Sequence, residues 1–241
     1  MSKVSIIIPC YNEEQRLKKD PFLQLLYSQA DVQLILVNDG STDKTMLLLE
    51  EIRKAGPQKV KVISYAQNQG KSFAIFKGMQ EALHNNSQFI GYLDADLSTG
   101  IPEFLQLVQI AEQEQADYIF GSRVKMLNHA INRSALRHIC GRMLATLIDT
   151  RYNLGIYDTQ CGAKMFRAEI IRLITDEPFK TRWLFDVEIF LRIRGTSKTA
   201  KGLEIPLKNW TDPGHSKISL SSFPRVCAEL LRLIKHYKRT K

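Results

Sequence analysis

Short apolar segments of strand-forming composition recur along this chain and are separated by helix-period stretches. The segments cover residues 4–8, 34–37, 60–63, 89–93 and 117–120. In the stretches between them, apolar residues return with the spacing of a helix face. This alternation predicts βα repeats, and therefore an α/β fold with a mostly parallel, Rossmann-like sheet flanked by helices.

The chain is long enough to bury one substantial core. It has 241 residues, 44% of them hydrophobic, and domains of this length commonly stand alone. We expect a main domain over residues 1–220, in which residues 132–148 and 182–194 form helices and residues 203–210 a late strand. Residues 221–241 predict a basic amphipathic helix, whose apolar stripe is Val226, Leu230, Leu233, Ile234 and Tyr237.

The balance of charge indicates an anionic partner. The formal net charge is +9, which suits nucleic acid, an anionic lipid surface or a phosphorylated substrate. Neither a zinc finger nor an aromatic-rich RNA signature accompanies the charge, so we expect no nucleic acid. The apolar runs are too short to span a membrane, and the start shows no secretory signal, so we expect a cytoplasmic protein. The four cysteines lack metal-ligand spacing and are expected to be reduced.

Acidic residues follow several of the predicted strands. Asp94 and Asp96 come directly after the segment at 89–93, Asp39 follows the segment at 34–37, and Glu13 lies just beyond the first segment. Ligands of open parallel sheets bind beyond the carboxyl ends of the strands. Carboxylates two residues apart on an extended segment point to the same side and suit Mg²⁺ or Mn²⁺ bound together with phosphates. The same spacing also occurs in ordinary exposed turns, and the motif alone leaves both interpretations open.

A series of motifs resembles glycosyltransferase family 2, of the glycosyltransferase-A fold. In chain order they are "VSIIIPCYNEE", "LILVNDGSTDKT", "QNQGKSFAIFKGM", "YLDADLS", "GSR", "YDTQCGAKMF", "RWLFDVEIF" and "NWTDPGHSKI". They run from residue 4 to residue 218 and cover nearly the whole chain. The last four resemble the branch of dolichyl-phosphate β-glucosyltransferases and other polyprenyl-phosphate glycosyltransferases.

The resemblance implies a nucleotide-sugar site. Asn38 stands where the family commonly has an acid, and Ser98 where related enzymes often have Gln. By the resemblance, Asp94 and Asp96 bind a Mg²⁺ or Mn²⁺ ion and the donor diphosphate. The residues implied to bind the donor are Pro9, Tyr11, Glu13, Asp39, Lys71, Asp94, Ala95 and Asp96.

The resemblance also implies a site for an acceptor phosphate and the transferred sugar. Ser122 and Arg123 of "GSR" would contact the phosphate, which arginine binds through forked donors. Arg133 and Arg137 could join them, or could lie on a solvated basic face. The further candidates are Asp158, Thr159 and Gln160 in the cavity, and His215 and Lys217 closing near the donor phosphates. Cys161 is expected to be a small buried hydrophobic residue rather than a nucleophile.

The resulting hypothesis is an inverting, metal-dependent transfer of one hexose to a polyprenyl or dolichyl phosphate. The resemblance favours glucose from UDP-glucose and a catalytic set of Asp94, Asp96, Arg123 and Asp186. A peripheral contact with a membrane surface is expected through the C-terminal helix, although its stripe could instead pack on the domain. A separate membrane-protein partner is a further hypothesis.

Two alternatives stay open from the sequence. A related enzyme could transfer sugar to a hydroxyl of a cell-wall or surface glycan, and would need a general base such as Asp186, Glu188 or Asp158. A different class, a sugar nucleotidyltransferase, should carry a Gly-rich triphosphate loop after the first strand, where this chain has "PCYNEEQRLKK". A silent nucleotide-sugar binding protein would not need the two acids at Asp94 and Asp96.

Overall fold

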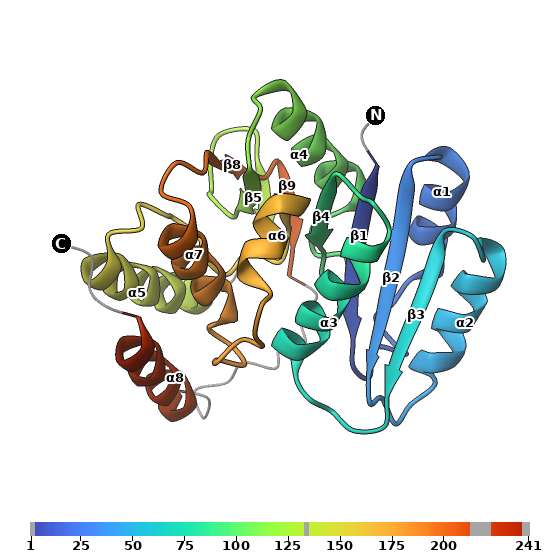
Figure 1. The fold of residues 1–241 in the computed structure, drawn as a ribbon, viewed down its shortest axis with the longest axis horizontal. Coiled ribbons are helices and arrows are strands. Elements are labelled where there is room, and N and C mark those ends of the chain that lie inside the picture. The colour runs from blue at the N-terminus through green and yellow to red at the C-terminus, as the bar shows by residue number, and fades with distance from the viewer. Residues whose placement is uncertain (1–2, 133–134, 213–222, 238–241) are drawn as a thin grey trace.

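The computed structural model describes residues 3–132, 135–212 and 223–237, without the side chains of 135–137 and 223. A seven-stranded sheet with the strand order β3-β2-β1-β4-β7-β5-β8 forms its centre (Figure 1). The strands are β1 (Val4–Cys10), β2 (Val32–Asp39), β3 (Val60–Tyr65), β4 (Phe89–Tyr92), β5 (Tyr118–Ser122), β7 (Lys164–Arg167) and β8 (Gly202–Pro206).

All the strand pairs of this sheet are parallel except those made by β7. That strand lies between β4 and β5 and runs antiparallel to both. The predicted α/β fold and its mostly parallel sheet are therefore confirmed, and each of the five predicted strands is present. The predicted late strand is in fact two strands, β8 and the short β9 (Asn209–Thr211), because β9 leaves the main sheet and pairs with β6 (Ala130–Asn132).

Helices cover both faces of the sheet. One face packs against α1 (Lys19–Ser28), α2 (Thr45–Ala55) and α4 (Ile101–Gln113). The other packs against α3 (Lys71–His84), α6 (Ala168–Ile174) and α7 (Phe185–Thr196). Because β1 and β2 lie in the middle of this arrangement, their side chains are buried on both faces, which explains their continuous apolar sequence.

The remaining two helices lie at the end of the molecule away from α1 and α2 (Figure 1). They are α5 (Ala135–Tyr152) and α8 (Phe223–His236), which share a small apolar core with α7. Of the predicted C-terminal stripe, Leu233 is fully buried in that core, and Leu230 and Tyr237 pack against it. The division of the chain at residue 220 stays a prediction. No helix in the described part of the chain is long and apolar enough to cross a membrane.

Candidate active site

The loops that follow β1 and β2 are tied together by hydrogen bonds. The backbone N–H of Glu13 donates to Oγ1 of Thr45 at 2.7 Å, and Oδ1 of Asn12 accepts from the N–H of Thr42 at 2.9 Å. These contacts hold the first loop against the second. They place together the predicted donor residues of the first loop, which are the half-buried Pro9 and Tyr11 and the buried Glu13.

Asp39, at the end of β2, organises the turn that precedes α3. It is only 2% exposed. Its carboxylate accepts from Nδ2 of Asn68 at 2.9 Å, from the N–H of Gln69 at 2.8 Å and from the N–H of Gly70 at 2.7 Å. Since an ionised carboxylate has about four acceptor positions, most of the hydrogen-bonding capacity of Asp39 is used inside the protein.

Lys71, the first residue of α3, reaches the acid pair after β4. Its Nζ lies 2.5 Å from Oδ1 of Asp94. Burial alone would lower the pKa of Lys71, but the carboxylates of Asp94, Asp186 and Asp96 outweigh it and the pKa is raised. Lys71 is therefore a cation at neutral pH, next to the predicted metal and diphosphate motif.

The acid pair offers oxygen ligands that a hard divalent cation prefers. Oδ1 of Asp96 accepts from the N–H of Ser98 at 3.0 Å and from its Oγ at 2.7 Å, so Ser98 orients this carboxylate. Oδ2 of Asp96 has no hydrogen-bond partner among the described residues. Within the same residues no group of three or more His, Cys, Asp or Glu could hold a metal ion. Two carboxylates are too few to enclose an ion, so the pair would suit a Mg²⁺ or Mn²⁺ ion that also binds substrate phosphates. Ala95, between the two acids, is buried.

Arg123, immediately after β5, forms a forked ion pair with Asp158. Its Nε donates to Oδ2 at 2.7 Å and its Nη2 to Oδ1 at 2.8 Å, and its backbone N–H also donates to Oδ2. Burial would lower the pKa of Arg123, but the Asp158 carboxylate outweighs it and the pKa is raised. Arg123 is therefore fixed as a cation, and its Nη1 has no partner in the described part of the chain.

Two buried polar atoms near this pair lack a partner among the described residues. They are Oγ of Ser122 and Nε2 of Gln160. Buried polar groups are rarely left without a hydrogen bond, because each one costs free energy. Both residues were predicted to contact the acceptor or the sugar, and a bound phosphate or sugar hydroxyl would satisfy them.

A buried charge that the sequence analysis missed lies at the start of β7. Lys164 is fully buried, and its Nζ contacts Oδ1 of Asp186 at 2.5 Å and donates to the carbonyl of Cys161 at 2.6 Å. Tyr92 donates its hydroxyl to the same carboxylate of Asp186. The only available signal was a lysine within the apolar run "AKMF", which indicates an inward-facing charge that needs a partner.

Gly162 brings the two halves of the site into contact. A Cβ at this residue would lie 1.9 Å from Oδ2 of Asp94, so the backbone before β7 presses directly on the acid pair. The charge of Asp94 also acts on Arg123 on the other side. The structure therefore brings the predicted donor motif and the predicted acceptor residues to one place.

Glu188, the remaining candidate for a general base, has a cationic partner of its own. Glu188 is fully buried and accepts from Nη2 of Arg192 at 2.8 Å. Several predictions fall outside what the structure describes, namely Arg133, His215, Lys217 and the side chain of Arg137.

Comparison with known sequences shows the family of this chain. A sequence profile described as Glycosyl transferase family 2 matches residues 5–175. The protein is therefore a glycosyltransferase, and it belongs to glycosyltransferase family 2.

Named relatives and solved structures are similar along nearly the whole chain. A dolichyl-phosphate beta-glucosyltransferase of Drosophila melanogaster is 33% identical, covering 90% of this chain and 69% of that protein. The enzyme of the same name from Saccharomyces cerevisiae is 29% identical, with 90% and 70% covered. Glucosyl-3-phosphoglycerate synthase from Mycobacterium tuberculosis, solved with Mn²⁺ and UDP, superposes with a TM-score of 0.71 at 15% identity, covering 100% of this chain and 81% of that one. The structural likeness shows a shared fold.

Replacing Gly162 with Ala should lower activity while leaving the protein folded. The new methyl group must displace the Asp94 carboxylate, which is a side chain that can move, so the strain falls on the acid pair. We expect glycosyl transfer to drop at least about tenfold with little change in melting temperature. Gly195→Ala is the matched control, because nothing lies within 4 Å of its Cβ position. Unchanged activity of Gly162→Ala would show that the position of Asp94 does not matter.

Cysteine labelling tests the assignment of Cys161 as a structural residue. Burial raises the pKa of its thiol to about 11, and the thiolate is the reactive form. Iodoacetamide at neutral pH should therefore modify the exposed Cys140 and Cys227 within minutes and leave Cys10 and Cys161 unmodified until the protein is denatured. Peptide mass spectrometry gives the result, and rapid native labelling of Cys161 would contradict it.

Proposed function

We propose that this enzyme transfers a hexose, with inversion, from a nucleoside diphosphate sugar to a lipid-linked phosphate. The proposed donor is UDP-glucose and the proposed acceptor is dolichyl or polyprenyl phosphate. The names of the relatives support the sugar and the acceptor, since several are dolichyl-phosphate beta-glucosyltransferases. The acid pair supports a requirement for Mg²⁺ or Mn²⁺.

One observation favours a phosphate acceptor over a sugar hydroxyl. The three carboxylates considered as general bases are all engaged in ion pairs, Asp158 with Arg123, Asp186 with Lys164 and Glu188 with Arg192. A carboxylate whose oxygens already contact a cation is poorly placed to take a proton from an acceptor hydroxyl. A phosphate monoester has a second pKa of about 6 and is largely ionised at neutral pH, so it attacks without a base.

The residues on the acceptor side suit a phosphate anion. Nη1 of Arg123 and Oγ of Ser122, which have no partner among the described residues, can donate to phosphate oxygens. An acceptor oxygen then forms a bond to the anomeric carbon as the bond from that carbon to the diphosphate breaks, and no proton has to move. Attack from the face opposite the diphosphate inverts the configuration.

The residues on the donor side stabilise the leaving group. Lys71 holds Asp94 and brings a positive charge to the diphosphate, while Ser98 orients Asp96. A divalent ion bound by Asp94 and Asp96 would supply neutralising charge for the departing diphosphate. Stabilising the leaving group in this way requires charged side chains that are already in position before the reaction. The ion pairs and turns of the site hold them there.

A peripheral membrane contact is part of the proposal, and the described structure favours α5 as its location. Ile139, Met143 and Leu147 follow one another at helical spacing and are 56%, 68% and 52% exposed. Arg142 lies beside them on the same helix. An exposed apolar stripe with an adjacent cation suits the headgroup region of an anionic bilayer.

Asp96→Asn should abolish metal-dependent transfer without unfolding the protein. We expect a loss of roughly 10²-fold or more, because a charge that stabilises the leaving group is removed. The assay combines labelled UDP and GDP sugars, polyprenyl phosphate, and Mn²⁺, Mg²⁺ or EDTA, and follows label into the organic phase. Asp31→Asn, at an exposed acid away from the site, is the control. Label that stays aqueous while the donor is hydrolysed would move the acceptor to a hydroxyl-bearing glycan.

Met143→Glu should weaken binding to anionic vesicles. Full burial of a methionine side chain is worth about 1.5–3 kcal/mol, so we expect roughly tenfold weaker binding in sedimentation with phosphatidylglycerol vesicles. Leu47→Glu introduces the same change at a 61% exposed position on α2 and should bind like the parent protein. Equal loss in both variants would mean that added charge alone is responsible, and no vesicle binding by the parent protein would refute the membrane contact.

A further inference from the structure

The segment that leads into α7 is held by two buried carboxylates. Glu188, on α7 itself, accepts from the N–H of Lys180 at 2.9 Å and from the N–H of Thr181 at 3.0 Å. Glu229, on α8, accepts from the N–H groups that follow. Every backbone N–H from residue 180 to residue 184 therefore donates to one of these two side chains.

Glu229 makes its contacts across 45 to 47 residues of sequence. Its carboxylate accepts from the N–H of Arg182 at 3.2 Å, and from those of Trp183 and Leu184 at 2.8 Å each. Glu229 is only 5% exposed, and Leu233 one turn later is fully buried. Hydrogen bonds from N–H groups to a buried charge are strong and directional, so the C-terminal helix fixes the backbone of this segment.

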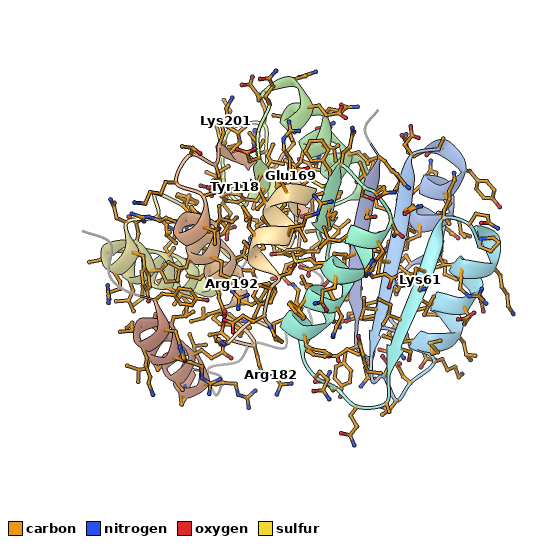
Figure 2. The ribbon with its side chains drawn as sticks, viewed as in Figure 1. Lys61, Tyr118, Glu169, Arg182, Arg192 and Lys201 are labelled. Atoms are coloured by element: carbon orange, nitrogen blue, oxygen red, sulfur yellow. The ribbon has the colours of Figure 1, made fainter. Side chains whose placement is uncertain are left out.

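The segment carries a guanidinium group into the donor side of the site. Nη2 of Arg182 is 3.4 Å from Oδ1 of Asn68, whose Nδ2 in turn donates to Asp39. A Cβ at Gly70 would lie 2.8 Å from Nε of Arg182, so the guanidinium lies against the turn just before Lys71. Figure 2 shows Arg182 between the C-terminal helix and the start of α3.

The charge of Arg182 is not used inside the described part of the protein. Arg123 and Arg192 both have carboxylate partners, whereas among the described residues Arg182 forms no ion pair and meets only the neutral amide of Asn68. Its side chain is also exposed to solvent. A guanidinium that is positioned next to a ligand site without a carboxylate partner is suited to an anionic ligand.

We propose that Arg182 binds the nucleoside diphosphate of the donor, and that Glu229 is a positioning residue that holds Arg182 there. The proposal rests on the proposed function, because it requires a nucleoside diphosphate in the site between Asp39 and Asp94. It gives the C-terminal helix a role in donor binding that is separate from any contact with a membrane.

The test is a thermodynamic cycle on nucleotide binding. UDP with Mg²⁺ is titrated calorimetrically into the full-length parent protein, Arg182→Gln, Glu229→Gln and the double variant, and GDP serves as a second probe. We expect each single variant to bind about tenfold more weakly, since one charged hydrogen bond is lost or misplaced. If Glu229 acts through Arg182, the double variant binds about as weakly as Arg182→Gln alone. The KM for the donor should rise in the same variants while the KM for the acceptor stays unchanged.

Ile148→Ala is the matched control for loss of packing. Ile148 is buried in the apolar core shared by α5, α7 and α8, but makes no hydrogen bond to the segment at 182–184. The Ile148→Ala variant should have a lower melting temperature and an unchanged affinity for UDP. If Glu229→Gln does not fold, Glu229→Asp keeps the charge with a shorter reach and takes its place.

Three outcomes overturn the proposal. If Arg182→Gln binds UDP as tightly as the parent protein, the proposal is wrong, whether or not the Glu229 variants fold. Additive losses in the double variant would show that Glu229 does not act through Arg182. If the parent protein binds neither UDP nor GDP, the proposed function fails as well. If the parent binds normally and either of the first two results is found, only the roles of Arg182 and Glu229 are refuted.

Discussion

The buried ion pair between Lys164 and Asp186 is the interaction on which the active-site end of the sheet depends. Lys164 is fully buried, and it is paired in register with Tyr92 of β4 and with Phe120 of β5. Its side chain therefore lies beside the last residue of β4 and the middle residue of β5. Removing one member of such a pair costs about 3–5 kcal/mol, since the remaining charge stays buried without a partner. Because Asp186 lies in the first turn of α7, the pair also joins that helix to the sheet.

The reversed direction of β7 is what brings the two halves of the site together. An antiparallel strand between β4 and β5 begins at the edge where its neighbours end, so the chain just before it passes across that edge. This passage contains Asp158, which holds Arg123, and Gly162, which touches Asp94. A fully parallel strand in the same place would carry this segment to the opposite edge of the sheet. The acid pair and the arginine would then have no common boundary.

The parts of the fold that have a local cause could be predicted from the sequence. The strands β1 to β5 are marked by their own apolar runs, and acids at the ends of such strands, including Asp39 and Asp94, were identifiable because parallel sheets bind ligands there. Arg123 was predicted only through the family resemblance of its "GSR" motif. β7 was missed because it has only four residues, and its strand character comes from pairing with two neighbours. The partners of Asp186 and Glu229 were also out of reach, because a contact across 22 or 45 residues leaves no periodic signal in the sequence. The sequence thus predicted a candidate site, while the ion pairs that determine which charged groups already have a partner could be seen only in the tertiary structure.

The contacts that α8 makes with the domain limit its role at a membrane. Leu233 cannot lie in a bilayer while it is buried against α5 and α7, and Glu229 cannot keep its three backbone donors if α8 moves away. The face of α8 that the sequence suggested for a membrane is therefore largely used by the protein itself. What α8 leaves outward is Leu231 and Ile234, at 66% and 38% exposed, and these are a smaller apolar surface than the stripe on α5. A membrane contact that preserves these hydrogen bonds would consequently have to leave the inner side of α8 docked on the domain.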